Sequence, residues 1–260
     1  DCKMFGWNAN QYQKFEAQRT LPAMDLARAI PLSTVKSCLD VGCGIGNSTA
    51  VLQQQFPEAQ ILGVDSSENM LQTAKNEHPQ AEYQLLDAGT ELPSLNRTFD
   101  VVFSNACIQW IPQQNQILSD MMGLLNPGGV LAVQIPQQAK HPVQQILQQM
   151  AKSEPWREKL QARTFYTLSE SEYYDQLSER TTDFRMWETV YFHEMPSHES
   201  ILEWYRGTGL RPYLAQLQES DHPIFEQELL ERIKQTYPVQ KNGTILFRFP
   251  RLFWIARKGN

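Results

Sequence analysis

The chain of 260 residues lacks any apolar run that approaches the roughly 20 residues needed to cross a bilayer. Its first residues also lack the basic end and apolar core of a secretory signal. We therefore expect no membrane partner.

Cysteine is scarce, with four residues in the chain: Cys2, Cys38, Cys43 and Cys107. Their spacing contains none of the paired patterns of structural metal sites. A chain of this size buries enough apolar surface to fold without disulfide staples. We expect reduced thiols, a cytoplasmic location and no metal site.

Basic patches are missing as well. The net charge is −6, and the lysines and arginines are scattered rather than gathered in a stripe. Proteins that bind nucleic acid ordinarily present such a stripe, so the sequence argues against a nucleic-acid partner. The hydrophobic and charged fractions, 41% and 20%, are those of an ordinary globular protein.

Strand-like and helix-like patterns alternate between about residues 35 and 136. Alternation with short connections is typical of a parallel sheet with helices on both faces, an α/β fold. Asn47 or Ser48 is expected to cap the first of these helices, and Ser66 or Ser67 the second. The predicted strands are 36–41, 59–65, 81–88, 99–106 and 130–135, and the predicted helices are 47–56, 66–77 and 115–125.

The pattern changes after Pro136. Residues 141–180 and 197–236 read as helical, on either side of an alternating strand at 184–195. Residues 244–258 read as two strand pieces separated at Pro250, because proline interrupts a strand ladder. A further helix is expected over residues 8–30.

A glycine-rich loop follows the first predicted strand in LDVGCGIGNS, with Gly42, Gly44 and Gly46 at alternate positions. The loop has no Gly-Lys-Ser/Thr, so it does not predict a triphosphate site, and its third glycine is too early for a dinucleotide site. A plain tight turn and an S-adenosylmethionine site remain. The second fits better, because close backbone approach at the end of a strand needs glycine.

Acidic residues end three neighbouring strands, which suits a cationic ligand better than a pyrophosphate. Asp40 can face a cationic methionine tail, Asp65 can accept both ribose hydroxyls, and Asp87 can accept from an adenine amino group. Taken singly, Asp65 also fits a helix cap and Asp87 a turn. Their joint placement favours the cofactor.

The successive motifs LDVGCGIGNS, GVDSSENML, LLDA, FDVVFSNACIQW and LLNPGGVLAVQIP resemble those of the class I S-adenosylmethionine-dependent methyltransferases. The resemblance implies a Rossmann-like sheet of seven strands whose last strand is antiparallel, and S-adenosylhomocysteine as product. It implies that the cofactor binds to Asp40, Gly42, Cys43, Gly44, Asn47, Asp65, Ser66, Met70, Asp87, Ala88, Asn105, Ala106 and Trp110.

A closer resemblance extends over nearly the whole chain, through YQKFEAQRTLPAMDL, NACIQWIP, YFHEMPSHESILEW, TGLRPYL and FPRLFWIAR. These stretches are similar to those of family members that methylate a carboxylate of a small tricarboxylic acid such as trans-aconitate. We expect one methyltransferase domain over residues 1–260. Its expected parts are an N-terminal lid helix (1–34), a cofactor-binding core (35–136), a substrate cap (137–242) and a C-terminal strand (243–260).

A carboxylate substrate is already ionised at neutral pH, so the reaction needs no general base, and catalysis comes from alignment. We therefore predict no catalytic acid or base, but cations that hold a polyanion, arginine best of all. Each candidate also has a plain reading as a solvated or packing residue. The substrate-binding candidates are Tyr12, Arg19, Trp110, His193, Arg211 and Arg251.

Two other functions stay open at this point. A methyltransferase acting on a malonyl carrier protein would also esterify a free carboxylate; net acidity disfavours it, and Arg248 favours it. A non-catalytic regulator would bind S-adenosylmethionine without turnover. The sequence does not set the oligomeric state.

Overall fold

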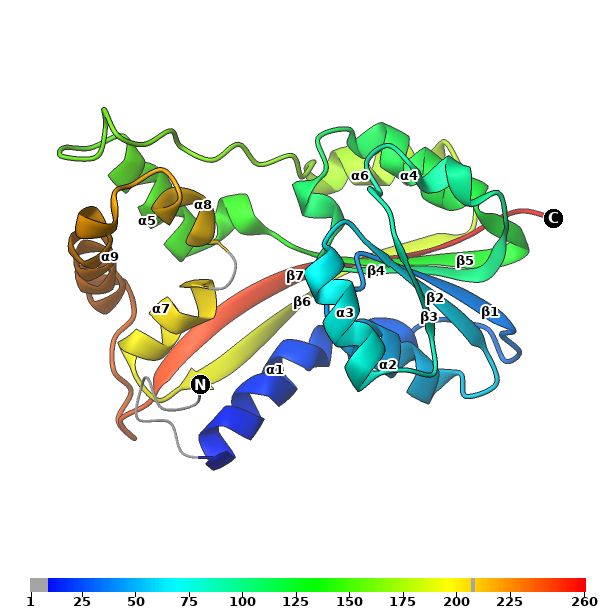
Figure 1. Cartoon of the computed structure of the whole chain (residues 1–260), viewed down its shortest axis with the longest axis horizontal. Coiled ribbons are helices and arrows are strands. Elements are labelled where there is room, and N and C mark those ends of the chain that lie inside the picture. Colours follow the sequence, from blue (N-terminus) through cyan, green and yellow to red (C-terminus); the bar gives the residue numbers. More distant parts are fainter. Residues whose placement is uncertain (1–8, 207–208) are drawn as a thin grey trace. The chain divides into compact units, whose positions relative to one another are not determined.

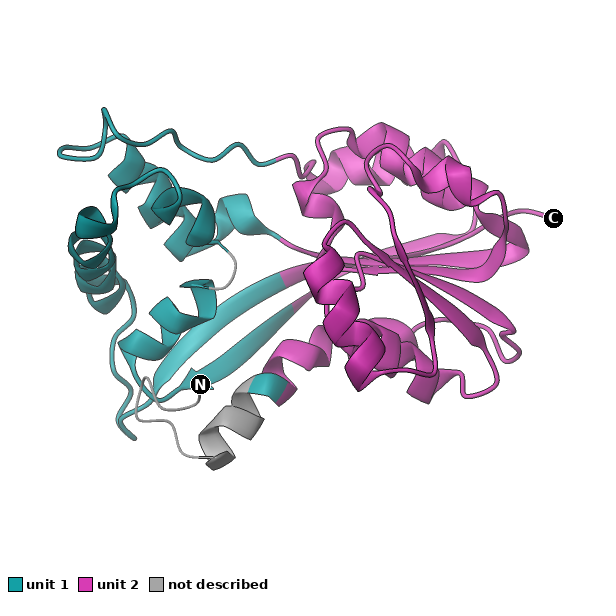
Figure 2. Ribbon diagram, viewed as in Figure 1, with its two compact units in different colours: residues 1–16, 137–165, 190–250 teal, residues 17–136, 166–189, 251–260 magenta. Residues whose placement is uncertain are grey.

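The computed structural model describes residues 9–206 and 209–260, with side chains from residue 16 onward. The chain divides into two compact units (Figure 2). Unit 1 is residues 1–16, 137–165 and 190–250, and unit 2 is residues 17–136, 166–189 and 251–260. The predicted division into four parts of one domain stays a prediction.

The sheet has seven strands in the order β3-β2-β1-β4-β5-β7-β6 (Figure 1). Strands β1 to β5 pair in parallel, whereas β7 pairs antiparallel to β5. This confirms the predicted fold class. The strands are β1 (Ser37–Val41), β2 (Gln60–Asp65), β3 (Glu82–Leu85), β4 (Phe99–Asn105), β5 (Leu125–Pro136), β6 (Phe184–Met195) and β7 (Ile245–Arg257).

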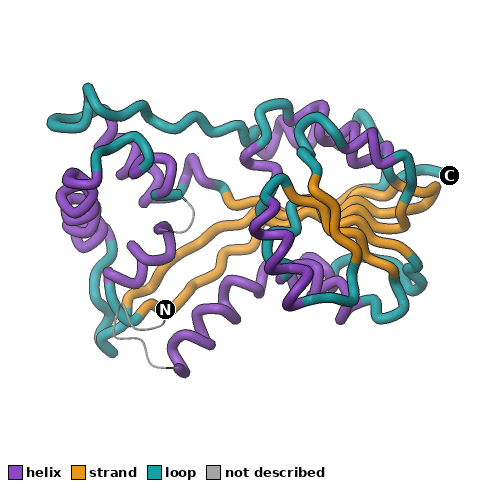
Figure 3. The backbone as a smooth tube through the Cα atoms, viewed as in Figure 1, coloured by secondary structure: helices purple, strands orange, loops and turns teal. Residues whose placement is uncertain are grey.

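Helices flank the strands, as Figure 3 shows in purple and orange. The α-helices are α1 (Ala9–Arg28), α2 (Asn47–Gln55), α3 (Glu68–Glu77), α4 (Gln114–Gly123), α5 (Pro142–Ala151), α6 (Glu170–Ser178), α7 (His198–Arg206), α8 (Arg211–Leu214) and α9 (His222–Thr236). Over the described ranges 9–206 and 209–260, no helix is both long and apolar enough to span a membrane.

Both faces of the unit 2 sheet are covered, which explains its nearly continuous apolar strands. Alternate side chains such as Leu39, Val102 and Leu131 form one buried cluster with Leu118 of α4 and Leu177 of α6. Helices α2 and α3 lie on the opposite face (Figure 1). Asp40 points to this second face, because it alternates with Leu39 along β1.

Two sequence predictions about the later part of the chain are wrong in detail. β7 is one continuous strand through Pro250, because pairing with β5 begins only at Arg251 and the missing proline N–H is not needed there. The helix predicted over 141–180 is interrupted between α5 and α6. Pro155 lies in that gap, and Ser169 starts α6 with a capping box to Glu172.

The cap predicted for α2 is also wrong. Gly46 precedes the helix in a left-handed conformation and no side chain caps it. Ser48 instead donates its hydroxyl to the buried carboxylate of Asp40. The cap predicted for α3 is confirmed, since Ser67 Oγ accepts from the backbone N–H of Met70 at 3.3 Å.

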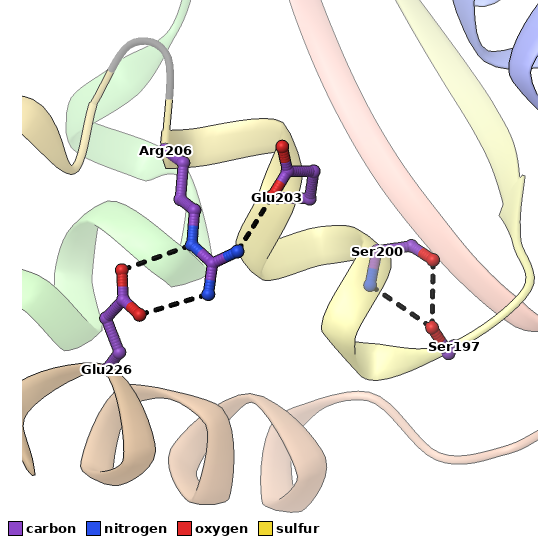
Figure 4. A network of polar contacts seen from close by, with 5 residues as sticks. All are labelled: Ser197, Ser200, Glu203, Arg206 and Glu226. Atoms are coloured by element: carbon purple, nitrogen blue, oxygen red, sulfur yellow. Dashed lines mark hydrogen bonds and ion pairs between the residues drawn. The ribbon is translucent and has the colours of Figure 1, made fainter. Parts of the chain in front are cut away.

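Unit 1 has its own core, built from α5, α7, α8, α9 and the parts of β6 and β7 that belong to it. Polar contacts join two of these helices (Figure 4). Arg206 at the end of α7 bonds Glu226 of α9 through Nε and Nη2, and Glu203 through Nη1. Ser197 accepts from the N–H of Ser200 at the start of α7. The strand predicted at 184–195 between the two helical stretches is confirmed as β6, which joins the sheet beside β7.

Candidate active site

The glycine-rich loop connects β1 to α2 in unit 2. Gly42, Gly44 and Gly46 have φ values of 76°, 54° and 94°, in the left-handed region that glycine adopts without strain. The N–H groups of Gly42 and Cys43 both donate to the carbonyl of Val64 on β2, at 2.9 and 3.0 Å. The turn is thereby fixed to the end of the neighbouring strand.

The three glycines are required for different reasons. A Cβ on Gly42 would lie 2.3 Å from Sγ of Cys107, and one on Gly46 would lie 2.7 Å from the ring of His78. These two positions are closed by the protein itself. A Cβ on Gly44 would meet only Sδ of Met70, at 3.9 Å. Gly44 is therefore the position where the loop leaves room for a ligand beside the backbone.

Asp40 is a fully buried carboxylate directly before this loop. Its Oδ2 accepts from the hydroxyls of Ser48 and Thr49 at 2.7 and 2.8 Å, whereas Oδ1 is buried without a hydrogen-bond partner in the described part of the chain. Burial raises the pKa of Asp40 to about 6; the two hydroxyls oppose this shift, and the nearby charge of Asp65 adds to it. A buried oxygen of this kind suits a cationic or hydrogen-bond-donating ligand group.

Asp65 ends β2 with its carboxylate held by two backbone groups. Oδ2 accepts from the N–H of Gly44 and Oδ1 from the N–H of Ser67, both at 2.9 Å. Each oxygen keeps a second lone pair. The carboxylate is therefore oriented before any ligand binds, and it can still accept from two hydroxyls. Ser66 and Met70 lie beside it with exposed side chains.

Asp87 lies two residues beyond the end of β3, which is shorter than predicted. Its Oδ1 accepts from the N–H of Gly89 at 2.9 Å, which is the turn contact that an aspartate makes by itself. Oδ2 has no hydrogen-bond partner among the residues that the structure describes. Asp87 is exposed and Ala88 half-buried, so this oxygen is accessible to a donor.

Asn105 ends β4, and Ala106 follows it. Ala106 has a φ of 54°, uncommon for a residue with a Cβ, and its N–H donates to the carbonyl of Gln134 at 2.8 Å. Oδ1 of Asn105 accepts from Nε2 of Gln134 at 2.7 Å. Oε1 of Gln134 accepts from Nη1 of Arg251 at 3.3 Å. The structure thus brings together two predicted residues, Asn105 and Arg251, through a third.

Two further predicted cofactor residues, Cys43 and Asn47, belong to the loop and the helix that follows it. Cys43 is buried, and a Cβ on Gly63 of β2 would be 2.9 Å from its Sγ, so the thiol packs on the sheet. Burial raises the pKa of this thiol. Asn47 is the exposed first residue of α2.

The substrate-binding candidates are distributed over both units. Unit 2 holds Arg19, which is exposed on α1, Trp110, which is 38% exposed, and the buried Arg251. Unit 1 holds Arg211, which is exposed at the start of α8, and His193. Tyr12 belongs to α1, but its side chain lies outside the described residues.

His193 is not at an open surface. It is 2% exposed and stacks on Tyr191 and Trp204, with ring centroids 6.1 and 5.2 Å apart. Phe247 and Phe249 pack around the same ring. This environment matches the structural reading of this histidine better than direct contact with an anion.

Known proteins match the chain over almost its full length. Trans-aconitate 2-methyltransferases from Escherichia coli strains ATCC 8739 and E24377A are each 39% identical to it over 256 residues, which is 98% of this chain and 99% of the relative. The chain belongs to the trans-aconitate 2-methyltransferase family. Residues 38–129 also match a family described as "Methyltransferase domain". The membership confirms the predicted enzyme class.

Solved structures of low sequence identity share the fold. Phosphoethanolamine N-methyltransferase 2 of Haemonchus contortus, solved with phosphomonomethylethanolamine and S-adenosylhomocysteine, has a TM-score of 0.56 and 18% identity. The match covers 100% of this chain and 59% of that chain. The YcgJ protein of Bacillus subtilis has a TM-score of 0.57 and 14% identity, over 92% of this chain and 99% of that chain.

Sequence reasoning missed two polar residues that the structure places against candidate site residues: Thr49 donates to Asp40, and Gln134 donates to Asn105. Both are buried polar residues in apolar surroundings, at 1% and 0% exposure. A polar residue inside an apolar run, as in VLAVQIP, was the available signal, because a buried amide needs partners.

Proposed function

We propose that the protein transfers the methyl group of S-adenosylmethionine to a carboxylate of trans-aconitate or a closely similar polycarboxylic acid. The observation that carries this proposal is the match to trans-aconitate 2-methyltransferases along 98% of the chain. S-Adenosylmethionine supplies an activated methyl group on a sulfonium, and the products are a methyl ester and S-adenosylhomocysteine.

The residues of the candidate site fit that cofactor. The space beside Gly44 allows close approach to the loop, and the oriented Asp65 carboxylate can accept two ribose hydroxyls. The buried Oδ1 of Asp40 can accept from the cationic amino group of the methionine part. Asp87, Ala88, Asn105, Ala106 and Trp110 are proposed to complete the contacts, and Gly42 and Cys43 to fix the loop.

The acid substrate needs alignment and charge compensation rather than proton transfer. Its carboxylates are ionised at neutral pH, so no residue has to remove a proton before attack on the methyl group. Arg251 is proposed to supply this charge. Its guanidinium is only 8% exposed and is linked to Asn105 through Gln134. A buried arginine is costly unless anions or polar groups compensate it.

The alternatives are less favoured. The match with trans-aconitate 2-methyltransferases favours a small free acid over a carrier-bound malonyl group. A regulator without turnover has no support in the comparisons. A small-molecule substrate, no nucleic-acid partner and a cytoplasmic location remain parts of the proposal, and the oligomeric state is left open.

The proposal is tested by methyl transfer from labelled S-adenosylmethionine to trans-aconitate, cis-aconitate, citrate, isocitrate and a malonyl thioester. We expect ester formation with trans-aconitate, and an Arg251→Gln variant whose KM for the acid is raised at least tenfold, as loss of a charged hydrogen bond implies. Arg157→Gln is the matched control, because Arg157 is exposed and pairs with the equally exposed Glu154, three residues earlier in the turn after α5. Turnover of the malonyl thioester alone would reject the proposed substrate.

A further inference from the structure

Three polar side chains lie on one face of the unit 2 sheet. Asn105 on β4 is the register partner of Gln134 on β5, and Gln134 is the partner of Phe253 on β7. Arg251 lies two residues before Phe253, so it shares the face of Gln134 and sits diagonally across from it. The three residues thus form a row across three adjacent strands, at the level where β4 ends.

In both hydrogen bonds along this row, the chemistry of the side chains decides which atom donates and which accepts. An arginine has donors and no acceptor, so the atom of Gln134 that faces Nη1 of Arg251 must be its oxygen. The amide nitrogen of Gln134 therefore faces Asn105, whose oxygen must accept it at 2.7 Å. The charge of Arg251 thereby fixes the orientation of two amides.

The result is a defined donor at the end of β4. Because the bond from Gln134 fixes Oδ1 of Asn105 toward β5, Nδ2 points the other way, and Nδ2 has no partner among the residues that the structure describes. Asn105 is half-buried, whereas Gln134 is fully buried, so the donor is at the accessible end of the row.

We propose that Gln134 is a positioning residue for the methyl transfer. By accepting from Arg251 it holds the guanidinium for a substrate carboxylate, and by donating to Asn105 it keeps the Nδ2 donor of Asn105 directed to the bound ligands. This inference rests on the proposed function, because it assigns Arg251 to the acid substrate.

The choice of glutamine rather than glutamate is part of the inference. A carboxylate at position 134 would bind Arg251 at least as firmly. However, it would have no N–H for Asn105, so that amide would have to turn over and present its oxygen. A neutral amide can accept from the guanidinium of Arg251 and donate to Asn105 at the same time.

The test compares Gln134→Leu and Gln134→Glu with the wild type in steady-state methyl transfer to trans-aconitate, together with thermal unfolding. Both variants are expected to raise KM for the acid at least tenfold, with a smaller change in KM for S-adenosylmethionine. Asn126→Ala is the matched control. Asn126 also joins β5 to β4, through Asp100, but at the opposite end of these strands.

The glutamate variant distinguishes a residue that positions the ligand-binding groups from one that only stabilises the pairing of the strands. A glutamate at position 134 can still accept from Arg251 and from a turned Asn105 amide. If Gln134 only holds the strands together, Gln134→Glu should therefore have the kinetics of the wild type. That result would overturn the inference. A lower unfolding temperature in Gln134→Leu with unchanged KM would overturn it as well. Absence of turnover by the wild type would reject the proposed substrate and this inference together, whereas an active wild type with unchanged variants rejects the inference alone.

Discussion

The backbone N–H of Gly44 donates to Oδ2 of Asp65 at 2.9 Å, although 21 residues separate the two in sequence. The contact ties the glycine loop after β1 to the acid at the end of β2. Glycine and aspartate therefore act as one unit, in which the loop orients the carboxylate and the carboxylate holds the loop.

Replacing Asp65 with asparagine is expected to weaken cofactor binding strongly. An asparagine side chain has one oxygen, so it cannot accept from Gly44, Ser67 and two ribose hydroxyls as the carboxylate can. We expect the Kd for S-adenosylhomocysteine to rise about tenfold to a hundredfold, as for loss of hydrogen bonds to a charged group. Isothermal titration calorimetry measures it, and Glu77→Gln, on the exposed end of α3, is the control. An unchanged Kd would contradict the assigned role.

Alanine at Gly42 should mainly lower the unfolding free energy, whereas alanine at Gly44 should mainly weaken cofactor binding. Gly42→Ala forces a Cβ to 2.3 Å from the Cys107 thiol at positive φ, and is expected to cost about 2–5 kcal/mol of unfolding free energy. Gly44→Ala meets no such clash and should cost only about 1–2 kcal/mol, for its φ, while filling the space proposed for the cofactor.

Urea unfolding and S-adenosylhomocysteine titration measure the two effects separately. Gly123→Ala is the control, since nothing lies within 4 Å of its added Cβ. If Gly44→Ala binds the cofactor as tightly as the wild type, the loop does not approach the ligand at that residue.

The sequence predicts those parts of this protein that depend on neighbours along the chain. The glycine loop, the order of strands and helices in residues 35–136 and the Ser67 cap all rest on local patterns, and the structure confirms them. The predicted break of the last strand at Pro250 is wrong, because the pairing register of β7 decides whether the missing N–H of the proline matters.

Long-range contacts were beyond sequence reasoning. Gln134 and Arg251 are 117 residues apart, and only the antiparallel pairing of β7 with β5 brings them onto one face. Asn47 or Ser48 was predicted to cap α2, but neither does, and the hydroxyl of Ser48 donates to the buried carboxylate of Asp40 instead. In both cases burial of a charged group selects the partner, and burial is a property of the assembled fold.

Arg206 is expected to stabilise unit 1. It is 29% exposed and makes a bidentate contact to Glu226, which is 21% exposed, in addition to Glu203. Since bidentate, partly shielded pairs exceed ordinary surface pairs, Arg206→Met should cost roughly 1–2 kcal/mol. Differential scanning calorimetry measures the shift. Arg157→Met, whose pair with Glu154 is 64% and 65% exposed, should leave the transition unchanged. Equal effects of both variants would show that the network adds nothing specific.

Asp40 should make the protein less stable as the pH rises through the acidic range. Burial raises its pKa to about 6 in the folded protein, against a usual value of 3.8. Between these two values the folded state binds more protons than the unfolded state, so the unfolding free energy falls with increasing pH and levels off above about 6. A difference of about 2 pKa units corresponds to about 3 kcal/mol.

An Asp40→Asn variant cannot titrate at this position, so its stability relative to the wild type should rise by about that amount between pH 4 and pH 6.5. Urea unfolding at four pH values across this range measures the difference. Asp100→Asn is the control. Burial alone would raise the pKa of Asp100, but hydrogen bonds from Asn126 and the backbone of Lys36 outweigh it and hold the pKa below its usual value. Asp100 is thus ionised in the folded state across this range, whereas in the unfolded chain it loses its last protons below about pH 5. The stability of Asp100→Asn relative to the wild type should therefore fall slightly up to about pH 5 and stay flat above it, which is opposite in sign to the curve of Asp40→Asn. Parallel curves for Asp40→Asn and the wild type would mean that the buried carboxylate ionises as it does in the unfolded chain.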